Sequence, residues 1–187
     1  MRGTLALLSL VGLALSSGSL AGKTANRIDL AGAWQLSLDR DDVGLDEQWY
    51  QSSLPAEQVI QLPGSLQSQG FGDDPGPDTK WTGSIRKDEW AKAKYAPYRT
   101  RDNFKMPFWL EPDKYYVGAA WYQKTVAIPS DWIGRRITLH LERAHWETRV
   151  WVGDTAIGLD RSLSTPHIYD LTDALKAGKN MVTIRVD

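Results

Sequence analysis

The feature that most constrains the fold of this chain is a series of short segments in which apolar and polar residues alternate. Residues 136–143 are the clearest case, because Ile137, Leu139 and Leu141 point one way and the residues between them are polar. An apolar residue at every second position is typical of a half-buried β-strand. The pattern predicts further strands over residues 33–38, 57–62, 120–128, 148–152, 155–158, 168–171 and 181–186. Short strands at regular spacing favour a β-sandwich or barrel over a parallel α/β sheet.

Two turn signals lie between these strands. The pair Gly153-Asp154 suits a two-residue hairpin, because glycine tolerates a positive φ. Residues 173–177 are expected to form one helical turn, capped by Asp170 or Thr172 and closed by the glycine that follows.

Residues 64–118 interrupt the strand pattern with frequent glycines and prolines. One or two helical turns are expected near residues 88–94. Loops of this length tend to be either functional or disordered. Disordered segments are poor in aromatic residues, whereas this one is rich in tryptophan, phenylalanine and tyrosine. We therefore predict an ordered, packed insertion.

The N-terminus resembles a secretory signal. Arg2 precedes an apolar run over residues 5–15, and Ser19-Leu20-Ala21 offers small residues where a signal peptidase would cut. The run is too short to span a bilayer, which takes about 20 apolar residues. An uncleaved anchor is the alternative. We expect a signal peptide over 1–21, a single domain over 22–187 and a secreted or periplasmic protein with no membrane contact after cleavage.

Composition excludes several kinds of function. The chain has no cysteine, which excludes disulfides, thiolate zinc sites and a cysteine nucleophile. Its formal net charge is -1, without the clustered basic excess of a nucleic-acid binder. We therefore predict no nucleic-acid partner.

Acidic residues and histidines offer two weak metal signals. Calcium prefers oxygen ligands, but the acidic residues Asp73, Asp74 and Asp78 do not have the spacing of an EF-hand loop and suit a solvated turn. Zinc could be bound by His140, His145 and His167 together with Glu142 or Glu147, but no pair has close ligand spacing. We predict neither a metal nor a cofactor.

One pair of carboxylates has residue types that could carry catalysis. Glu142 and Glu147 could act as the two acids of a glycosidase, which lie about 5–9 Å apart. Their neighbours Arg143 and Arg149 favour ordinary ion pairs instead. No catalytic residue is predicted within this chain.

Nine tryptophans are unusual for a chain of this length. A tryptophan ring can pack in a core or stack on the apolar face of a sugar. Those in or beside predicted strands are read as framework: Trp34, Trp121, Trp132 and Trp151. Those in loops are open to an interface or sugar role: Trp81, Trp90, Trp109 and Trp146, with Trp49 unassigned.

Many sequence blocks occur in the order found in one known domain. They are AWYQK at 120–124, IPSDW at 128–132, LHLERAHWET at 139–148, VWV at 150–152, YDLT at 169–172 and GKN at 178–180, followed by IRVD at 184–187, with GAW at 32–34 and LPG at 62–64 upstream. Together they resemble the N-terminal sugar-binding domain of glycoside hydrolase family 2. The family usually has Asn-Gly where this chain has Gly153-Asp154, and both pairs suit a tight hairpin.

The resemblance implies a jelly-roll β-sandwich of the galactose-binding type. It also implies that the catalytic glutamates lie in a (β/α)₈ barrel that follows an immunoglobulin-like domain. A barrel takes about 250 residues. The chain is thus expected to be the non-catalytic front part of a glycosidase, with a carbohydrate substrate and with those two domains as its partners.

On the same resemblance, five residues are expected to face the substrate pocket: Trp81, Trp109, His145, Trp146 and His167. Two alternatives stay open from the sequence. The chain could be a stand-alone secreted carbohydrate-binding module or lectin, or a scaffold sandwich with no sugar site.

Overall fold

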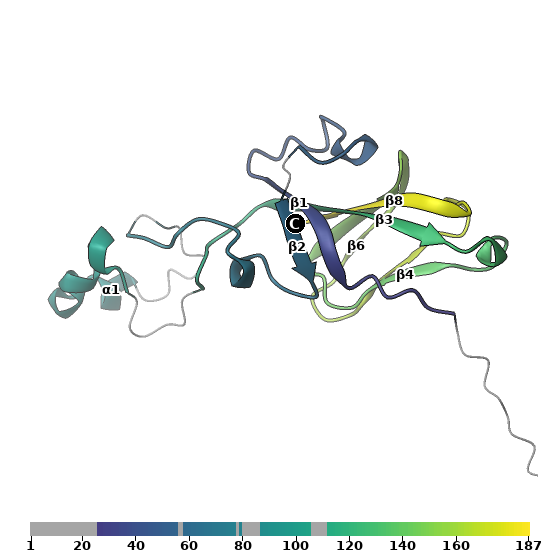
Figure 1. Cartoon of the computed structure of the whole chain (residues 1–187). Helices are drawn as coiled ribbons and strands as arrows, with labels where there is room; N and C mark the ends of the chain where they lie inside the picture. The colour runs from purple at the N-terminus through teal and green to yellow at the C-terminus, as the bar shows by residue number, and fades with distance from the viewer. Residues whose placement is uncertain (1–25, 56–57, 78, 80–86, 106–111) are drawn as a thin grey trace, which may run out of the picture.

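The alternating segments form the strands of two antiparallel sheets. The computed structural model describes residues 26–187 except 56–57, 78, 80–86 and 106–111. Within these residues the strands are β1 (Gly32–Asp39), β2 (Gln58–Leu62), β3 (Ala119–Ile128), β4 (Thr138–Leu141), β5 (Glu147–Val152), β6 (Thr155–Arg161), β7 (His167–Asp170) and β8 (Gly178–Val186). The larger sheet has the order β2-β1-β3-β8-β5-β6, and β4 pairs with β7 in the smaller one (Figure 1).

The core lies between the two sheets. Trp34 and Leu36 of β1 and Ile184 of β8 project from the larger sheet, and Leu139 of β4 and Tyr169 of β7 meet them from the smaller one. All five are at most 5% exposed. Because alternate residues of a strand point to opposite faces, the predicted period of two places one set inside. The all-β sandwich is confirmed.

A hydrogen-bonded group lies inside this core. The Thr148 hydroxyl is 2.6 Å from Nδ1 of His167 and 2.6 Å from the hydroxyl of Tyr169, which donates to the Thr148 carbonyl at 2.9 Å. Burial raises the pKa of the Tyr169 phenol, so it stays a donor. These bonds fix β5 against β7.

Replacing Thr148 with valine tests whether these hydrogen bonds stabilise the fold. Valine keeps the shape but leaves the buried partners of the hydroxyl unpaired, so we expect a loss of about 1–3 kcal/mol in the free energy of unfolding. Urea denaturation measures it. The matched control is Thr125→Val, because Thr125 is exposed on β3. Equal midpoints for the two variants would contradict the assignment.

A second apolar cluster covers the other face of the larger sheet. After β1 the chain crosses this face and contributes Trp49 and Tyr50, at the start of the 3₁₀ helix η1 (Trp49–Gln51) (Figure 1). Tyr50 stacks on Trp151 with ring centroids 4.9 Å apart, Trp151 stacks on Trp121 at 5.3 Å, and Trp49 lies 5.9 Å from Trp121. Trp121 is fully buried.

A buried carboxylate lies beside this cluster. Asp39 accepts a hydrogen bond from Trp121 Nε1 at 2.9 Å and further bonds from the backbone N–H groups of Val43 and Gly44. The segment after β1 is therefore held to the sheet by both apolar packing and a buried carboxylate.

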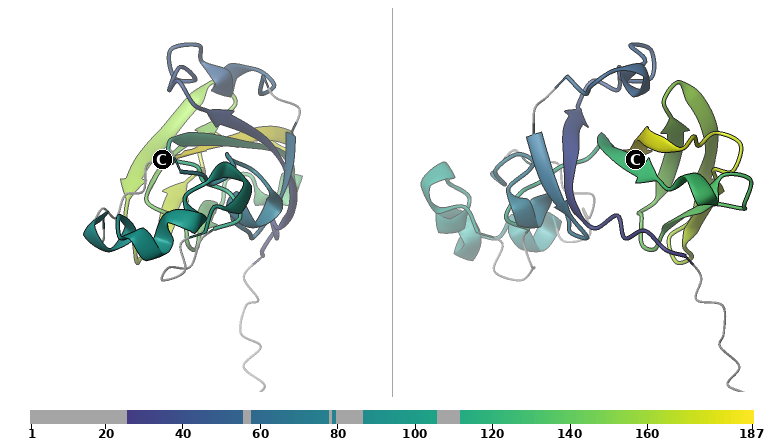
Figure 2. Two further views of the ribbon diagram at one scale, coloured as in Figure 1. Left: turned by 90° about the vertical axis from the view of Figure 1, so that its left-hand side faces the viewer. Right: turned by 45° about the vertical axis from the view of Figure 1, so that its right-hand side comes forward.

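The insertion contains short helices: η2 (Gln67–Gln69), α1 (Lys87–Trp90), η4 (Ala93–Tyr98) and η5 (Arg101–Asn103). The predicted helical turns near residues 88–94 are confirmed by α1 and η4. Figure 2 shows the portion with α1, η4 and η5 projecting from the sandwich, while Leu66 and Phe71, on either side of η2, pack against its core. Asp73 and Tyr115 join the two sides of its base by paired backbone hydrogen bonds of 2.8 Å. Gly72 permits this approach, because a Cβ there would lie 2.8 Å from the Tyr115 carbonyl oxygen.

Two predicted boundaries differ from the structure. Residues 172–174 form a turn, and no helix extends over 173–177. The expected helical turn is limited to one i→i−4 hydrogen bond, from the Leu175 N–H to the Leu171 carbonyl, beside a bond from the Ala174 N–H to the same carbonyl. Strand β8 begins at Gly178 rather than at residue 181, because residues 178–180 pair with residues 126–128 of β3. The Asn180 side chain holds the preceding loop through bonds to Lys176 and Gly178. The predicted bond between Asp170 and the turn is present, from the N–H and hydroxyl of Thr172.

The approach to β1 is fixed by a lysine of β3. Lys124 Nζ donates to the carbonyls of Leu30, Ala31 and Ala33, each at 3.1 Å, and lies 5.4 Å from the centroid of a Trp34 ring.

Strands β1 and β8 both run antiparallel to β3, and so run in the same direction. A short 3₁₀ helix, η6 (Ser130–Trp132), follows β3. In the described part of the chain, no helix is long and apolar enough to cross a membrane.

Candidate functional site

Several aromatic and charged side chains gather at one end of the larger sheet, where β8 ends. The register places Ala119 opposite Asp39, Ala120 opposite Val186 and Glu147 opposite Arg161. The ends of β1, β8 and β6 therefore lie beside the starts of β3 and β5. We call this end of the sandwich, where β1, β8 and β6 end, the exit end.

A hollow of about 500 Å³ lies at the exit end, between the base of the insertion and the segments that flank β1 and β3. Its walls combine two aromatic rings, an apolar residue and charged groups: Arg40, Asp73, Asp74, Tyr115, Tyr116 and Val117. Rings beside polar groups are the combination that binds sugars, because the ring stacks on C–H groups while charged groups bond to hydroxyls.

Ion pairs order the charged wall of the hollow. Arg40 Nη1 lies 2.9 Å from Asp73 Oδ2, and its guanidinium carbon lies 5.5 Å from the Tyr116 ring centroid. Lys114 Nζ lies 2.6 Å from Asp74 Oδ1. Burial raises the pKa of Tyr116 to about 12 against the opposing effect of Arg40, so its hydroxyl stays protonated and donates to the Ala119 carbonyl at 2.6 Å.

A network of ion pairs lies at the same end of the sandwich. Arg185 is 3% exposed, and its Nη2 contacts Asp42 at 2.6 Å and Asp187 at 2.9 Å. Its Nη1 lies 3.8 Å from Glu147, which Arg161 contacts at 2.6 Å and Arg149 at 3.1 Å.

The arginines decide the charge of Glu147. Burial works to raise the pKa of its carboxyl, but hydrogen bonds from Arg161 and Arg149 outweigh burial and hold it below its usual value. The carboxylate is therefore ionised at neutral pH, and it is only 7% exposed. The ion pair with Arg149 that the sequence favours is present.

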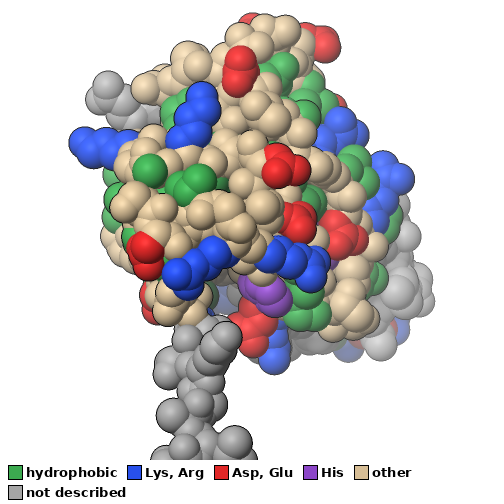
Figure 3. Space-filling model, turned by 90° about the vertical axis from the view of Figure 1, so that its right-hand side faces the viewer, with side chains coloured by type: hydrophobic (Ala, Val, Ile, Leu, Met, Phe, Trp, Pro, Cys, Tyr) green, Lys and Arg blue, Asp and Glu red, His purple; other side chains and the backbone are tan. Residues whose placement is uncertain are grey.

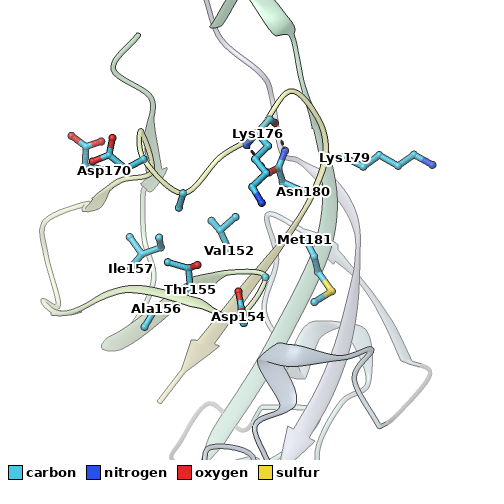
Figure 4. Close-up of a pocket in the computed structure, with 13 residues that line it drawn as sticks. Val152, Asp154, Thr155, Ala156, Ile157, Asp170, Lys176, Lys179, Asn180 and Met181 are labelled. Carbon is cyan, nitrogen blue, oxygen red and sulfur yellow. Dashed lines mark hydrogen bonds between the residues drawn. The ribbon is translucent and has the colours of Figure 1, made fainter. Parts of the chain in front are cut away.

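A second hollow of about 600 Å³ lies near the opposite end of the sandwich, between the β5–β6 hairpin and the loop before β8. Figure 4 shows Lys176 pointing into it and Lys179 pointing away, while the Asn180 amide is bonded to the loop backbone. Its lining residues include no aromatic side chain. Figure 3, seen from the side of that end, shows acidic and basic side chains interspersed. The exit-end hollow is thus the better candidate for a sugar.

The sequence of the sandwich matches one protein family. The family model described as "Glycosyl hydrolases family 2, sugar binding domain" matches residues 28–186. The chain belongs to this family. The resemblance read from the sequence blocks is confirmed.

Curated relatives of this sugar-binding domain are glycosidases. It is 25% identical over 166 residues to a β-galactosidase of Leuconostoc mesenteroides, covering 86% of this chain and 14% of that protein. It is 23% identical over 160 residues to a β-glucuronidase of Paenibacillus borealis, covering 85% of this chain and 20% of that protein. The chain spans a fifth or less of the length of either relative.

Solved structures show the same fold. A β-glucuronidase of Ruminococcus gnavus superposes with a TM-score of 0.58 at 18% identity, covering 84% of this chain and 20% of that one. At this level of identity the likeness is one of fold.

The five sequence-predicted pocket residues of this sugar-binding domain lie in different environments. Trp81 and Trp109 lie outside the described residues. His145 and Trp146 are exposed at the exit end, and the Trp146 N–H donates to the Asp187 carbonyl at 3.1 Å. His167 is fully buried, with Nδ1 at Thr148 and Nε2 3.2 Å from the Ser162 carbonyl. A ligand at the surface could not touch its ring in this conformation.

Two of the three acidic residues considered as calcium ligands form ion pairs instead. Asp73 and Asp74 contact Arg40 and Lys114, while Asp78 lies outside the described residues. Among the residues that the structure describes, no three His, Cys, Asp or Glu side chains form a group that could hold a metal ion.

Sequence reasoning missed the two tyrosines of the hollow and the Arg185 network. Arg40 and Asp73 are 33 positions apart, and Asp42 and Arg185 are 143 apart. No local spacing could join them. The available signal was the register of β1, β3 and β8, which brings the ends of these strands together.

Proposed function

We propose that this chain is the non-catalytic N-terminal domain of an exported glycoside hydrolase that cleaves O-glycosidic bonds. The observation that carries the proposal is the family match over residues 28–186, joined to relatives named β-galactosidase and β-glucuronidase. Those relatives are much longer than this chain. The proposal therefore assigns the catalytic groups to a barrel that follows an immunoglobulin-like domain in the same polypeptide.

The carboxylates of the chain support a non-catalytic role. A retaining glycosidase needs two carboxyl groups about 5–5.5 Å apart, one of them with a raised pKa so that it can donate a proton. The pKa of Glu147 is lowered, and three arginines surround this buried group. Glu142 is exposed. The pair therefore lacks the environment for acid–base work.

The exit-end hollow supports a role in substrate selection. Tyr115 and Tyr116 supply rings, and Arg40 with Asp73 and Asp74 supplies groups that bond to hydroxyls. Lining one edge of a pocket built mainly by another domain would let these groups bind a sugar without touching the bond that breaks. The insertion beside the hollow also carries Trp81 and Trp109, the two predicted pocket residues that lie outside the described part.

Export is part of the same proposal. It rests on residues 1–21, whose basic residue, apolar run and small residues before position 22 have the order of a signal peptide. The mature protein would then act in the periplasm or outside the cell.

The direct test is hydrolysis by the polypeptide of the complete gene beside the 187-residue chain, on a panel of chromogenic β-glycosides. We expect the longer polypeptide to hydrolyse at least one of them and the chain alone to show no rate above background, because the proposal assigns the catalytic groups to the barrel. The difference should be easy to measure, since enzymes accelerate reactions typically by 10⁶-fold or more. Hydrolysis by the chain alone would contradict the non-catalytic assignment.

A stand-alone carbohydrate-binding module remains the second candidate, favoured by the aromatic and charged lining of the hollow. The codons after residue 187 separate the two: an open frame of several hundred residues supports the enzyme, and a stop codon there supports the module. Glycan-array binding by the chain then separates a module from a scaffold without a sugar site.

A further inference from the structure

Exposed apolar side chains form a row along the exit end. Val117 is 66% exposed, Trp146 48% and Leu163 64%. Large apolar side chains exposed together, with polar groups around them, mark interaction surfaces, whereas single ones need no explanation.

Backbone pairing places them side by side. Val117 precedes β3, Trp146 precedes β5 and Leu163 follows β6, at the same end of three strands of one sheet. The Ser162 N–H donates to the Trp146 carbonyl at 3.0 Å, which brings the Leu163 loop beside Trp146. Strands β3, β8, β5 and β6 are consecutive neighbours, about 4.8 Å apart. The row therefore spans about 14 Å; we call it the exit row.

The chain leaves the sandwich in the middle of this row. Asp187 lies at the end of β8, between β3 and β5, and its carbonyl accepts hydrogen bonds from the N–H groups of Trp146 and Glu147 at 3.1 and 3.0 Å. Its carboxylate is held by Arg185 at 2.9 Å. The direction of the chain at this point is thus set by four groups on β5 and β8 and their flanks: Trp146, Glu147, Arg185 and the Asp187 N–H, which donates to the Glu147 carbonyl.

We infer that the exit row is the docking surface for the part of the parent polypeptide that directly follows Asp187. This inference rests on the proposed function, which places further domains after this one. The matched relatives extend far beyond the region they share with this chain. A segment that starts in the middle of an apolar row reaches it with a short linker, and a short linker gives a high effective concentration.

The surroundings of the row specify the chemistry of the partner surface. The row combines apolar side chains with charged ones: Asp187, in its middle, has a side chain that is 45% exposed, and the side chains of Asp42 and Arg161 are 66% and 56% exposed. Interfaces combine apolar contacts with hydrogen-bonded polar groups. Trp146 is its expected anchor, because tryptophan is enriched among the residues that contribute most to binding energy. The occupant is therefore a face of the next domain that offers both apolar side chains and polar partners.

The test compares the double variant Trp146→Ser, Leu163→Ser with the control Ile133→Ser. Ile133 is 45% exposed but follows β3 at the opposite end of the sheet. Each variant is made in the complete polypeptide, and the rate of limited proteolysis just after residue 187 is measured. We expect at least a tenfold faster cut in the double variant and no change in the control. The 187-residue chain should unfold in one cooperative transition in all variants, with only a small shift of the midpoint, which shows that the substitutions leave the sandwich folded.

Equal cutting rates in the wild type and the double variant would overturn the inference. So would a dimer of the complete polypeptide that Trp146→Ser dissociates while the cutting rate stays unchanged, because the row would then bind a second copy. Glycosidase activity of the wild type is measured separately. If the wild-type polypeptide is inactive but the double variant is still cut ten times faster, the proposed function is refuted and the docking surface is supported. If the wild type is active but the double variant is cut at the same rate, the docking surface is refuted and the proposed function is supported.

Discussion

Replacing Trp121 with alanine is expected to lower the free energy of unfolding of the 187-residue chain by about 3–5 kcal/mol, the usual cost of truncating a buried tryptophan. The ring is fully buried between Trp49 and Trp151. Its removal leaves a cavity that the neighbouring rings cannot fill, because Trp151 is held by Tyr50 on its other side. A domain of this size is stabilised by only about 5–15 kcal/mol in total.

A second loss adds to the cavity. Trp121 Nε1 donates to Asp39, a carboxylate that is 1% exposed and that also holds the N–H groups of Val43 and Gly44. Without the indole, Asp39 loses one of its partners while it stays buried, and an unpaired buried charge is costly. The segment after β1 should therefore loosen together with the ring packing.

Urea denaturation followed by tryptophan fluorescence measures the effect. Trp146→Ala is the matched control, because it removes the same side chain from an exposed position and should cost less than about 1 kcal/mol. If Trp121→Ala cost no more than this control, the aromatic cluster would not be a supporting element of the sheet.

The second large effect is expected from Glu147→Gln, at about 2–3 kcal/mol near pH 7. Hydrogen bonds to charged groups contribute about 1.5–3 kcal/mol, and removing one partner of a buried ion pair leaves the others with uncompensated charge. Here the carboxylate lies among Arg149, Arg161 and Arg185, and only Arg185 is itself buried. Arg185 keeps its bonds to Asp42 and Asp187, which limits the loss.

The pH dependence of this effect has a definite sign. The folded-state pKa of Glu147 lies below its unfolded value of about 4.3, so the carboxylate contributes its full stability above that value. The contribution falls as the pH drops through the lower, folded-state pKa. The difference between wild type and Glu147→Gln should therefore shrink in acid.

Denaturation midpoints at pH 7 and at pH values below about 4 measure this change. Glu142→Gln is the control, because Glu142 is exposed and close by in sequence. A stability difference between wild type and Glu147→Gln that is the same at both pH values would show that the ion pairs are not its source.

Much of the fold could be predicted because strand formation here depends on local pattern. Residues 136–143 alternate apolar and polar side chains, and the apolar ones, Ile137, Leu139 and Leu141, pack in or against the core on the side of the smaller sheet. The hairpin at Gly153-Asp154 was predictable for the same reason, since Gly153 has a φ of 55° and two residues suffice for the turn. The end of β6 was not, because residues 159–161 continue the strand through pairing with β5.

The candidate site was less predictable because it is assembled from distant segments. The hollow joins Arg40, Asp73 and Tyr116, which no spacing rule relates. The exposure of the histidines could not be predicted either: His145 is exposed, whereas His167 is fully buried, although both were expected to face a pocket. Which face a residue takes at the end of a short strand depends on register, and register is set by the partner strand.

The lysine that clamps the approach to β1 has a practical consequence for handling the protein. Because β1 and β8 run in the same direction, the segment that Lys124 holds enters the sandwich at the end opposite to Asp187 (Figure 1). A surface attachment or a fluorescent label placed before residue 28 would thus sit away from the exit row and the hollow. Immobilising the chain by that side would present both to a soluble glycan or to a separately produced following domain.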